Sequence, residues 1–455
     1  MKPDIRFTWN DGYAIAYQVI GRGRQDLVYL PGFASNVDIQ WDIPIYARFL
    51  ERLASFSRLI VIDRRGVGCS DRFPPGQAPT LEAITDDVLA VMEATSSGHA
   101  TVFAVQEAAF AALLLAASQP RRVARLVLFG ATPSWIQSED LPEEWSPDHW
   151  ESEIRSFERI TSATEAMAGY IRDAAPSLAD DEAAARALTS LIFNTNSPGA
   201  AAMESRFLSG VDLRHVLPSI RVPTLVLRRA GDDIVSDSSS RYLAGHIDGA
   251  QYVEVPGKDA LPWIGDQEPI LEAIEGFLGV DRSSPVSDRR LATVLFTDVV
   301  DSSARATALG DAAWSRLLAL HHQAIRTELA AHAGIEVDTA GDGFFATFSG
   351  PAQAVRCAIA ISDAVAALGI EVRIGVHTGE VETIAGKPGG AAVHLGARIL
   401  AAAGPSQVLV SQTVKDLVAG SGLRFEDSGE HELKGMPGAW RLYRVLAGQD
   451  ASVSR

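Results

Sequence analysis

Short apolar runs alternate with helical stretches through the first part of the chain. Five runs predict buried strands, at residues 26–30, 59–63, 100–105, 126–130 and 224–228. Parallel strands need long crossover connections, so the alternation predicts an α/β domain with a parallel sheet over residues 1–280. Between residues 133 and 218 the strand signals stop and Glu, Ala and Ser dominate, which predicts a helical cap over one end of the sheet.

A second pattern begins after a polar segment, residues 281–290, which contains Pro285 and predicts a linker. From residue 291 to residue 448 the sequence predicts a strand, a helix, two strands flanking the turn Ala340-Gly341-Asp342-Gly343, a second helix and a further strand. The order β-α-β-β-α-β resembles a ferredoxin-like α+β sandwich.

Charge and cysteine content limit the partners and the compartment. The 455 residues include 57 Asp and Glu against 40 Lys and Arg, and the net charge of −17 opposes binding to nucleic acid or to an anionic membrane. Cys69 and Cys357 are too few for a disulfide framework or a thiolate metal cluster. No apolar run approaches the ~20 residues of a membrane span. We expect a cytoplasmic protein with no membrane span and no nucleic-acid partner.

The first domain resembles the α/β-hydrolases in two strings, residues 63–70 (DRRGVGCS) and 30–33 (LPGF), the second in the place of the oxyanion loop. In that family one strand ends in G-x-S-x-G, a strained elbow that exposes the nucleophilic serine. Residues 104–108 (AVQEA) occupy that place here, so Gln106 stands where the serine should be. An amide is not a useful nucleophile, and no acyl-enzyme is expected.

The rest of the hydrolase triad is incomplete as well. Asp232 retains the position of the acid, whereas Ala260 stands where relatives carry the histidine base. Loss of the nucleophile or the base alone costs several orders of magnitude in rate. The resemblance therefore implies a degenerate hydrolase domain. It leaves open a sensor for a small apolar ligand beneath the cap, a scaffold for dimerisation, and an esterase with an unrecognised nucleophile.

The second domain resembles the class III nucleotidyl cyclases from about residue 290 to residue 445. Five strings occur in the family's order: residues 295–303 (LFTDVVDSS), 339–345 (TAGDGFF), 373–379 (RIGVHTG), 393–398 (VHLGAR) and 431–435 (HELKG). The resemblance implies conversion of a nucleoside triphosphate into a 3′,5′-cyclic nucleotide and pyrophosphate. Such a chemistry needs metal ions to activate the ribose hydroxyl and to hold the triphosphate.

The resemblance also implies roles for individual residues. Asp298 and Asp342, with the backbone of Val299, would bind two divalent ions, Mg²⁺ or Mn²⁺. The amides through Ser302 and Ser303 would cradle phosphate oxygens where a strand meets the next helix.

A second group of residues would act on the developing charge. Arg398 would stabilise charge at the α-phosphate, Lys434 would neutralise the distal phosphates, and His394 replaces the usual transition-state Asn. The family's catalytic centre lies between two cyclase domains, and this chain has one. The resemblance therefore implies a homodimer in which each site combines the two aspartates of one subunit with Arg398, His394 and Lys434 of the other.

Two positions bear on the choice of nucleotide. Adenylate cyclases commonly read adenine with a Lys and an Asp, and the matching positions here are Asp338 and Lys387, with the charges exchanged. This arrangement suits the N1–H and N2–H₂ donors and the O6 acceptor of guanine, and suits uracil in part. Alternatively, Asp338 and Lys387 pair with each other and leave the base poorly read, so that ATP, the family default, is used with relaxed selectivity.

A rival interpretation of the second domain is a catalytically impaired nucleotide-binding sensor, since positions 338, 387 and 394 all depart from the family pattern. Cys357, His321 and His322 lie in helical stretches and are expected to be packing or surface residues.

Overall fold

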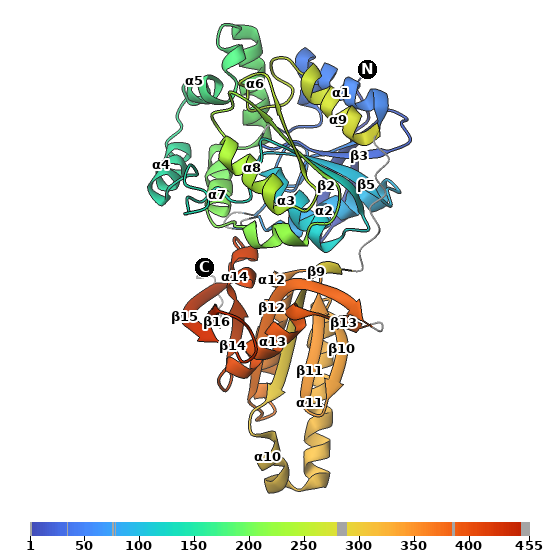
Figure 1. Cartoon of the computed structure of the whole chain (residues 1–455), viewed down its shortest axis with the longest axis vertical. Coiled ribbons are helices and arrows are strands. Elements are labelled where there is room, and N and C mark those ends of the chain that lie inside the picture. Colours follow the sequence, from blue (N-terminus) through green and yellow to red (C-terminus); the bar gives the residue numbers. More distant parts are fainter. Residues whose placement is uncertain are drawn as a thin grey trace. The chain divides into compact units, whose positions relative to one another are not determined.

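The computed structural model describes residues 2–33, 35–74, 77, 79–279, 289–384 and 387–446. The chain divides into two compact units, Met1–Ser287 (unit 1) and Asp288–Arg455 (unit 2), drawn in Figure 1. Residues 281–288 of the expected linker lie outside the described residues. Residues 289 and 290 belong to the first strand of unit 2.

Unit 1 is built on an eight-stranded sheet in the order β1-β2-β4-β3-β5-β6-β7-β8. The strands are β1 (Arg6–Asn10), β2 (Tyr13–Ile20), β3 (Asp26–Leu30), β4 (Arg58–Ile62), β5 (Ala100–Val105), β6 (Val123–Phe129), β7 (Thr224–Arg229) and β8 (Gln251–Val255). The pairs β1–β2 and β2–β4 are antiparallel, and every other neighbouring pair is parallel. The expected parallel sheet is confirmed. Strands β1, β2 and β8 were not among the five strands that the sequence predicted.

Helices connect the strands of unit 1 and cover its sheet (Figure 1). They are α1 (Pro44–Phe56), α2 (Leu81–Ala94), α3 (Ala108–Ser118), α8 (Asp237–His246) and α9 (Glu268–Gly279), with a 3₁₀ turn at Ile39–Asp42. Helix α3 has the sequence AAFAALLLAAS, and every one of its residues is buried. A helix that is apolar all round must lie inside the domain, and α3 is therefore a rigid support for the turn that precedes it.

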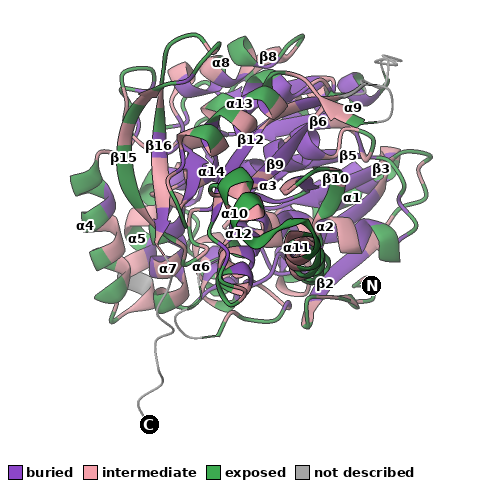
Figure 2. Cartoon of the chain, turned by 90° about the horizontal axis from the view of Figure 1, so that it is seen from below, coloured by how far each residue is buried: buried purple, intermediate pink, exposed green. Residues whose placement is uncertain are grey.

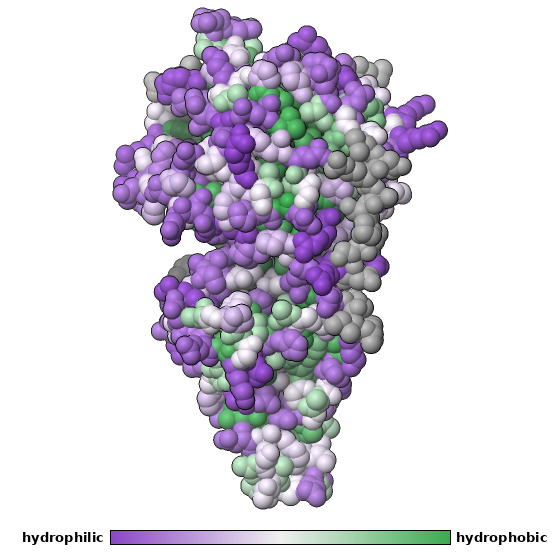
Figure 3. Space-filling model, in the orientation of Figure 1, coloured by the Kyte–Doolittle hydropathy of each residue, from purple (hydrophilic) through white to green (hydrophobic). Residues whose placement is uncertain are grey.

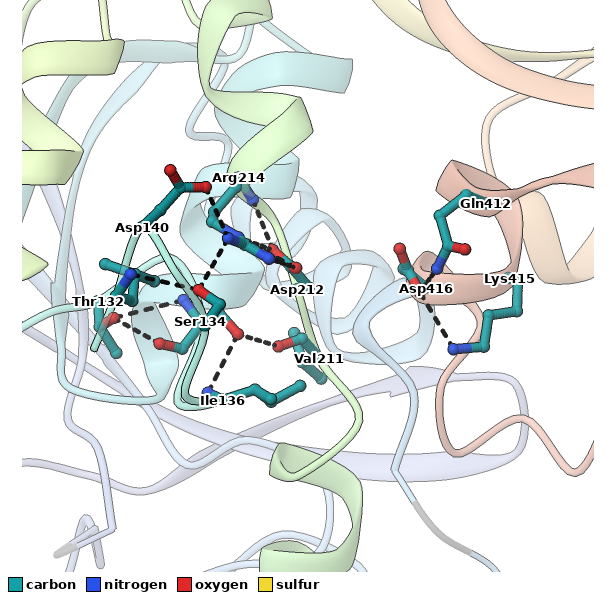
Figure 4. Close-up of polar contacts among 12 residues, drawn as sticks. Thr132, Ser134, Ile136, Asp140, Val211, Asp212, Arg214, Gln412, Lys415 and Asp416 are labelled. Carbon is teal, nitrogen blue, oxygen red and sulfur yellow. Dashed lines mark hydrogen bonds and ion pairs between the residues drawn. The ribbon is translucent and has the colours of Figure 1, made fainter. Parts of the chain in front are cut away.

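Four helices follow β6 and form the cap. They are α4 (Pro147–Glu158), α5 (Ala163–Ala174), α6 (Glu182–Thr195) and α7 (Pro198–Leu208), with 3₁₀ turns at Pro176–Leu178 and Arg214–Ser219. The two ends of this insertion are tied together, as Figure 4 shows. The Ser134 hydroxyl donates to the Val211 carbonyl at 3.1 Å, and the Arg214 guanidinium bonds both Asp212 and Asp140.

Unit 2 contains a second sheet, in the order β10-β11-β9-β12-β14-β16-β15, with β13 paired to β12. The strands are β9 (Arg289–Val299), β10 (Ile335–Ala340), β11 (Gly343–Phe348), β12 (Val372–Ile384), β13 (Lys387–Gly389), β14 (Val408–Ser411), β15 (Arg424–Glu432) and β16 (Ala439–Leu446). In the series β10-β11-β9-β12, each strand is antiparallel to its neighbours. Their order is that of a ferredoxin-like fold, and the expected fold class is confirmed.

The helices of unit 2 differ in how far they are buried. They are α10 (Ser302–Leu309), α11 (Asp311–Ala331), α12 (Pro351–Ala366), α13 (Ala391–Ala402) and α14 (Gln412–Leu417). Helix α12 packs into the core, whereas α10 buries no residue and α11 buries only His321, Ile325 and Leu329. Figure 2 shows this exposure along α10 and α11. None of the helices in the described ranges has the length and apolar character that a membrane crossing requires.

Candidate functional site

The two metal-binding aspartates predicted from the sequence lie at the same end of neighbouring strands in unit 2. Thr297 of β9 pairs with Phe344 of β11 in antiparallel register. Asp298 is one residue beyond Thr297, and Asp342 is two residues before Phe344. Because the strands run in opposite directions, Asp298 and Asp342 both lie past the Thr297–Phe344 pair, at the same end of the two strands. Sheet register thus brings together two residues that are 44 positions apart in the sequence.

Asp342 occupies a two-residue hairpin loop between β10 and β11. Gly341, at the first loop position, has a φ of +63°, the left-handed backbone that glycine adopts without strain. One carboxylate oxygen of Asp342, Oδ2, is buried and has no hydrogen-bond partner. A buried acceptor without a donor is costly, and here it is an oxygen ready for a cation.

Two histidines contact this loop: His321 is a buried packing residue and His322 is partly exposed, and each also makes a hydrogen bond that the sequence did not predict. His322 Nε2 lies 2.9 Å from the Gly341 carbonyl oxygen, and His321 Nε2 lies 3.1 Å from the Asp342 carbonyl oxygen. His321 is fully buried, which lowers the pKa of its imidazole. Their sequence pattern is that of any helix, and no local signal distinguished them.

Asp298 has a partner that sequence reasoning missed. Arg373 of β12 stands directly opposite Asp298 of β9, and its guanidinium forms an ion pair with Asp298 Oδ2. Both side chains are about one-third exposed, at 34% for Arg373 and 35% for Asp298. The arginine balances the charge of the carboxylate and fixes its direction. The signal was present in the string RIGVHTG, but only the strand register shows which residue Arg373 faces.

The chain between Asp298 and α10 is a tight connection. Val299 is buried at the end of β9, and Asp301 has a φ of +52°, a conformation uncommon outside glycine. Ser302 and Ser303 form the first turn of α10. Their backbone amides are those that a helix leaves without an internal partner, which suits them to anions.

The residues expected to act on the triphosphate lie elsewhere on unit 2. His394 and Arg398 are one helical turn apart on α13, and both are exposed. Among the described residues, no carboxylate pairs with either side chain. Lys434 is exposed in the turn between β15 and β16. Within one subunit these three side chains therefore present their charge or donors to solvent.

Asp338 and Lys387 form an ion pair in this structure. Lys387 Nζ lies 3.2 Å from Asp338 Oδ2, and the side chains are 59% and 58% exposed. Asp338 follows a bulge in β10 and stands opposite Phe345, whose ring stacks on Phe296 with centroids 4.5 Å apart. An exposed pair of this kind contributes little to stability, on the order of 0–1 kcal/mol, and exchanges readily with a ligand.

The carboxylates of Asp298 and Asp342 fit hard divalent cations such as Mg²⁺, since each presents oxygen donors and one oxygen is buried without a partner. In the described ranges, no three His, Cys, Asp or Glu side chains gather into a closed metal cage. An open pair of carboxylates is typical of sites where the substrate's phosphates complete the coordination of the metal.

The degenerate elbow of unit 1 retains the backbone of a nucleophile elbow. Gln106 lies between β5 and α3 with a φ of +51°, a strained conformation for a residue other than glycine. Its side-chain amide Nε2 contacts the Ala260 carbonyl oxygen at 3.4 Å. The strand-turn-helix geometry is thus present without a nucleophile.

The three positions of the former triad come together around Gly130. A Cβ built on Gly130 would lie 3.4 Å from Asp232 Oδ2, 3.8 Å from Gln106 Cγ and 3.9 Å from the Ala260 carbonyl oxygen. Asp232 Oδ1 accepts from the amides of two following residues, but Oδ2 is buried and has no partner. Burial raises the pKa of Asp232 to about 6. The fully buried Arg229 bonds the carbonyls on either side of Ala260 and fixes this loop.

Glu107 places a carboxyl group, paired with the Arg64 guanidinium, against the oxyanion loop. Its carboxylate oxygens lie 3.0 and 3.2 Å from where a Cβ would stand on Gly32. Glu107 shares the buried guanidinium of Arg64 with Glu204 of α7. Burial and the charge of Glu204 raise the pKa of Glu107 to about 7. A carboxylate in this position opposes formation of a second anion, as acyl transfer requires.

A cavity of about 460 Å³ lies between the loop after β4 and the cap helices α6 and α7. Its walls include apolar side chains, among them Phe73, Phe193 and Met203, and the charged pair Arg64 and Glu204. The volume is within the range of small-molecule sites. None of the three triad positions, Gln106, Asp232 and Ala260, is among its lining residues, so the cavity is separate from the elbow.

Two families match successive parts of the chain. The family described as alpha/beta hydrolase fold matches residues 27–264, and the family described as adenylate and guanylate cyclase catalytic domain matches residues 286–447.

Individual relatives follow the same division. Strigolactone esterase D14 of Arabidopsis thaliana is 27% identical over 246 residues, which cover 53% of this chain and 87% of the relative. Putative adenylate cyclase 3 of Rhizobium meliloti (strain 1021) is 31% identical over 155 residues, which cover 32% of this chain and 26% of the relative. The crystal structure of a hydrolase from Pseudomonas aeruginosa PA01 covers 61% of this chain and 99% of its own, with a TM-score of 0.52 and 24% identity, a likeness of fold alone.

Proposed function

The chain belongs to the alpha/beta hydrolase fold family through residues 27–264 and carries a C-terminal adenylate and guanylate cyclase catalytic domain, and from this premise we propose its reaction. The protein is a class III nucleotidyl cyclase that converts a nucleoside triphosphate into a 3′,5′-cyclic nucleotide and pyrophosphate. The observation that carries the proposal is the convergence of Asp298 and Asp342 at one end of β9 and β11, with a buried, unpartnered oxygen on Asp342.

Asp298 and Asp342 are the residues that would hold two divalent ions, Mg²⁺ or Mn²⁺, with the backbone of Val299 nearby. When bound, such ions lower the pKa of the ribose hydroxyl and neutralise the triphosphate. Arg373 of β12 pairs with Oδ2 of Asp298 and balances its charge before a cation arrives. The amides at Ser302 and Ser303 offer donors to phosphate oxygens at the start of α10.

The remaining roles require a second copy of the chain. Arg398 and His394 are exposed on α13, and Lys434 is exposed in a turn, so these side chains are free to meet the triphosphate held by a partner subunit. Arg398 would stabilise charge at the α-phosphate, Lys434 would neutralise the distal phosphates, and His394 would donate a hydrogen bond in the transition state. A homodimer then has two equivalent sites.

Apolar exposure on unit 2 supports this assembly. Leu309, Leu320 and Ile335 are 48%, 51% and 64% exposed. Apolar side chains show among polar ones on the surface of unit 2 in Figure 3. Burial of these side chains against a second copy of the chain would add to the stability of a dimer.

The ion pair between Asp338 and Lys387 bears on the choice of base. Because Asp338 and Lys387 already form an ion pair, a nucleobase must break that pair before it can form hydrogen bonds with either side chain. We propose that ATP is used with relaxed selectivity and that GTP is also accepted, since the exposed pair opens at little cost.

Unit 1 is proposed to be a pseudo-hydrolase that regulates or supports the cyclase. The strained elbow carries Gln106 in place of a nucleophile, no base stands at Ala260, and Glu107 places a carboxylate against the oxyanion loop. These observations weigh against an esterase. The cavity beneath the cap is the place where a small apolar ligand would bind.

The test is an assay of purified full-length protein with Mn²⁺ and each of ATP, GTP, UTP and CTP, measuring cyclic nucleotide and pyrophosphate. Formation of both products is expected with ATP and GTP. Asp298→Ala and Asp342→Ala should each abolish product while the far-ultraviolet circular dichroism is unchanged. No product from any nucleotide, with nucleotide still bound, would support the rival nucleotide-binding sensor. Activity that survives both substitutions would refute the metal assignment.

A further inference from the structure

The hairpin loop that carries Asp342 is held from outside the sheet. The last residue pair of β10 and β11 is Ala340 with Gly343, so the carbonyls of Gly341 and Asp342 have no partner in the strand ladder. His322 and His321 of α11 contact them, one ring to each carbonyl, at 2.9 and 3.1 Å. A carbonyl only accepts hydrogen bonds, so each ring donates from a protonated Nε2.

Adjacent residues on a helix point about 100° apart, and two neighbours seldom reach the same target. Here both reach the same loop, because each ring contacts one of two successive loop carbonyls. Both rings also meet the edge of Phe344, at centroid distances of 6.1 Å for His321 and 5.1 Å for His322. The loop is therefore fixed in two directions by one short stretch of helix.

The side chain of Asp342 depends on this fixation. Its Oδ2 is buried without a hydrogen-bond partner, so no donor orients that end of the carboxylate directly. Asp298, by contrast, has the Arg373 guanidinium. The direction of the Asp342 carboxylate is consequently set by the backbone of the loop. The two histidines contact that backbone from α11.

We propose that His321 and His322 are positioning residues, which hold the β10–β11 loop so that the Asp342 carboxylate stays beside Asp298 for cation binding. The proposal rests on the proposed function, in which Asp342 is a metal ligand. Both rings act through the loop carbonyls. The string TAGDGFF does not predict this support, because the donors lie on a helix, 21 and 19 residues before the carbonyls that they contact.

A further contact between α11 and the hairpin lies further from the loop. Arg326 donates two hydrogen bonds to Glu336 of β10, at 2.8 and 2.9 Å, and lies over the Phe344 ring. This contact keeps the helix attached to the strands when a histidine is replaced. A variant at position 322, whose side chain is only partly buried, should therefore fold while its loop loses one support.

The test measures Mn²⁺ binding to the full chain by isothermal titration calorimetry and by electron paramagnetic resonance. His322→Ala should weaken binding about 3- to 10-fold, the loss that one hydrogen bond produces. His322→Gln keeps an amide donor near the Nε2 position and should bind within about 2-fold of the unmodified protein. His332→Ala is the matched control, because His332 is the C-cap of the same helix and the partners of its ring, the carbonyl and the carboxylate of Glu328, belong to that helix and not to the loop. It should leave affinity unchanged.

His321 is fully buried, so His321→Gln is the variant used there, with affinity close to that of the unmodified protein expected. In the cyclase assay, His322→Ala should need more Mn²⁺ for half-maximal rate and recover its kcat at saturating Mn²⁺. Unchanged affinity in His322→Ala, or equally weak binding in His322→Gln, would overturn the positioning role. Asp342→Asn separates the two proposals: if it binds Mn²⁺ like the unmodified protein, the metal assignment itself fails.

Discussion

Replacement of Asp232 by Asn should stabilise unit 1 at neutral pH. Asp232 is 2% exposed, and its Oδ2 is buried without a hydrogen-bond partner. A working hydrolase triad uses such a carboxylate to orient a histidine, but Ala260 stands in the place of that histidine. The buried charge therefore has a cost in stability and no catalytic use in this chain. In Asp232→Asn, Oδ1 can keep both backbone amide donors.

The size of the effect follows from the shifted pKa. Burial raises the pKa of Asp232 from the model-compound value of 3.8 to about 6. The native state then binds the proton more tightly than the unfolded state, so the free energy of unfolding falls as pH rises from about 4 to about 6. At 1.36 kcal/mol per pKa unit, the loss is about 3 kcal/mol above pH 7. Asp232→Asn removes this loss, and its advantage should grow by about 1.5 kcal/mol between pH 5 and pH 7.5.

Urea unfolding followed by tryptophan fluorescence is the assay. Six of the eight tryptophans lie within residues 1–279, so the signal reports mainly on unit 1. Asp233→Asn is the matched control, since Asp233 is the exposed neighbour and its replacement should change the midpoint little. A difference between Asp232→Asn and the unmodified protein that is the same at pH 5 and pH 7.5 would refute the argument that the buried charge is unpaired.

Two further predictions concern the altered positions. Asp338→Lys combined with Lys387→Asp keeps an ion pair and restores the arrangement common in adenylate cyclases, so the ratio of ATP to GTP turnover should rise; an unchanged ratio would show that these side chains do not read the base. Gln106→Ser combined with Ala260→His should leave hydrolysis of p-nitrophenyl acetate at background, because the Glu107 carboxylate still opposes the oxyanion. Adding Glu107→Ala should raise that rate, and rapid turnover without it would contradict the role given to Glu107.

Local patterns were sufficient for the fold class and for the identity of the candidate residues. The alternation of strands and helices predicted the parallel sheet of unit 1, because each buried strand must be apolar along its whole length. The strings around Asp298 and Asp342 indicated the cyclase domain because they resemble, in the same order, those of the class III cyclases. The absence of a nucleophile at position 106 was also predicted from the sequence, since it depends only on the residue being Gln.

What each side chain touches was decided by the tertiary structure. Arg373 opposes Asp298 only through the register of β9 with β12, and His321 and His322 reach the Asp342 loop only because α11 packs beside the hairpin. Asp338 and Lys387 left two interpretations open in the sequence, and folding brought them into contact. Sequence periodicity records which face of an element is buried, whereas pairing between elements depends on register and packing over long separations. The residue types that a site needs can therefore be identified from local sequence, whereas the partners of those side chains are determined by the tertiary structure.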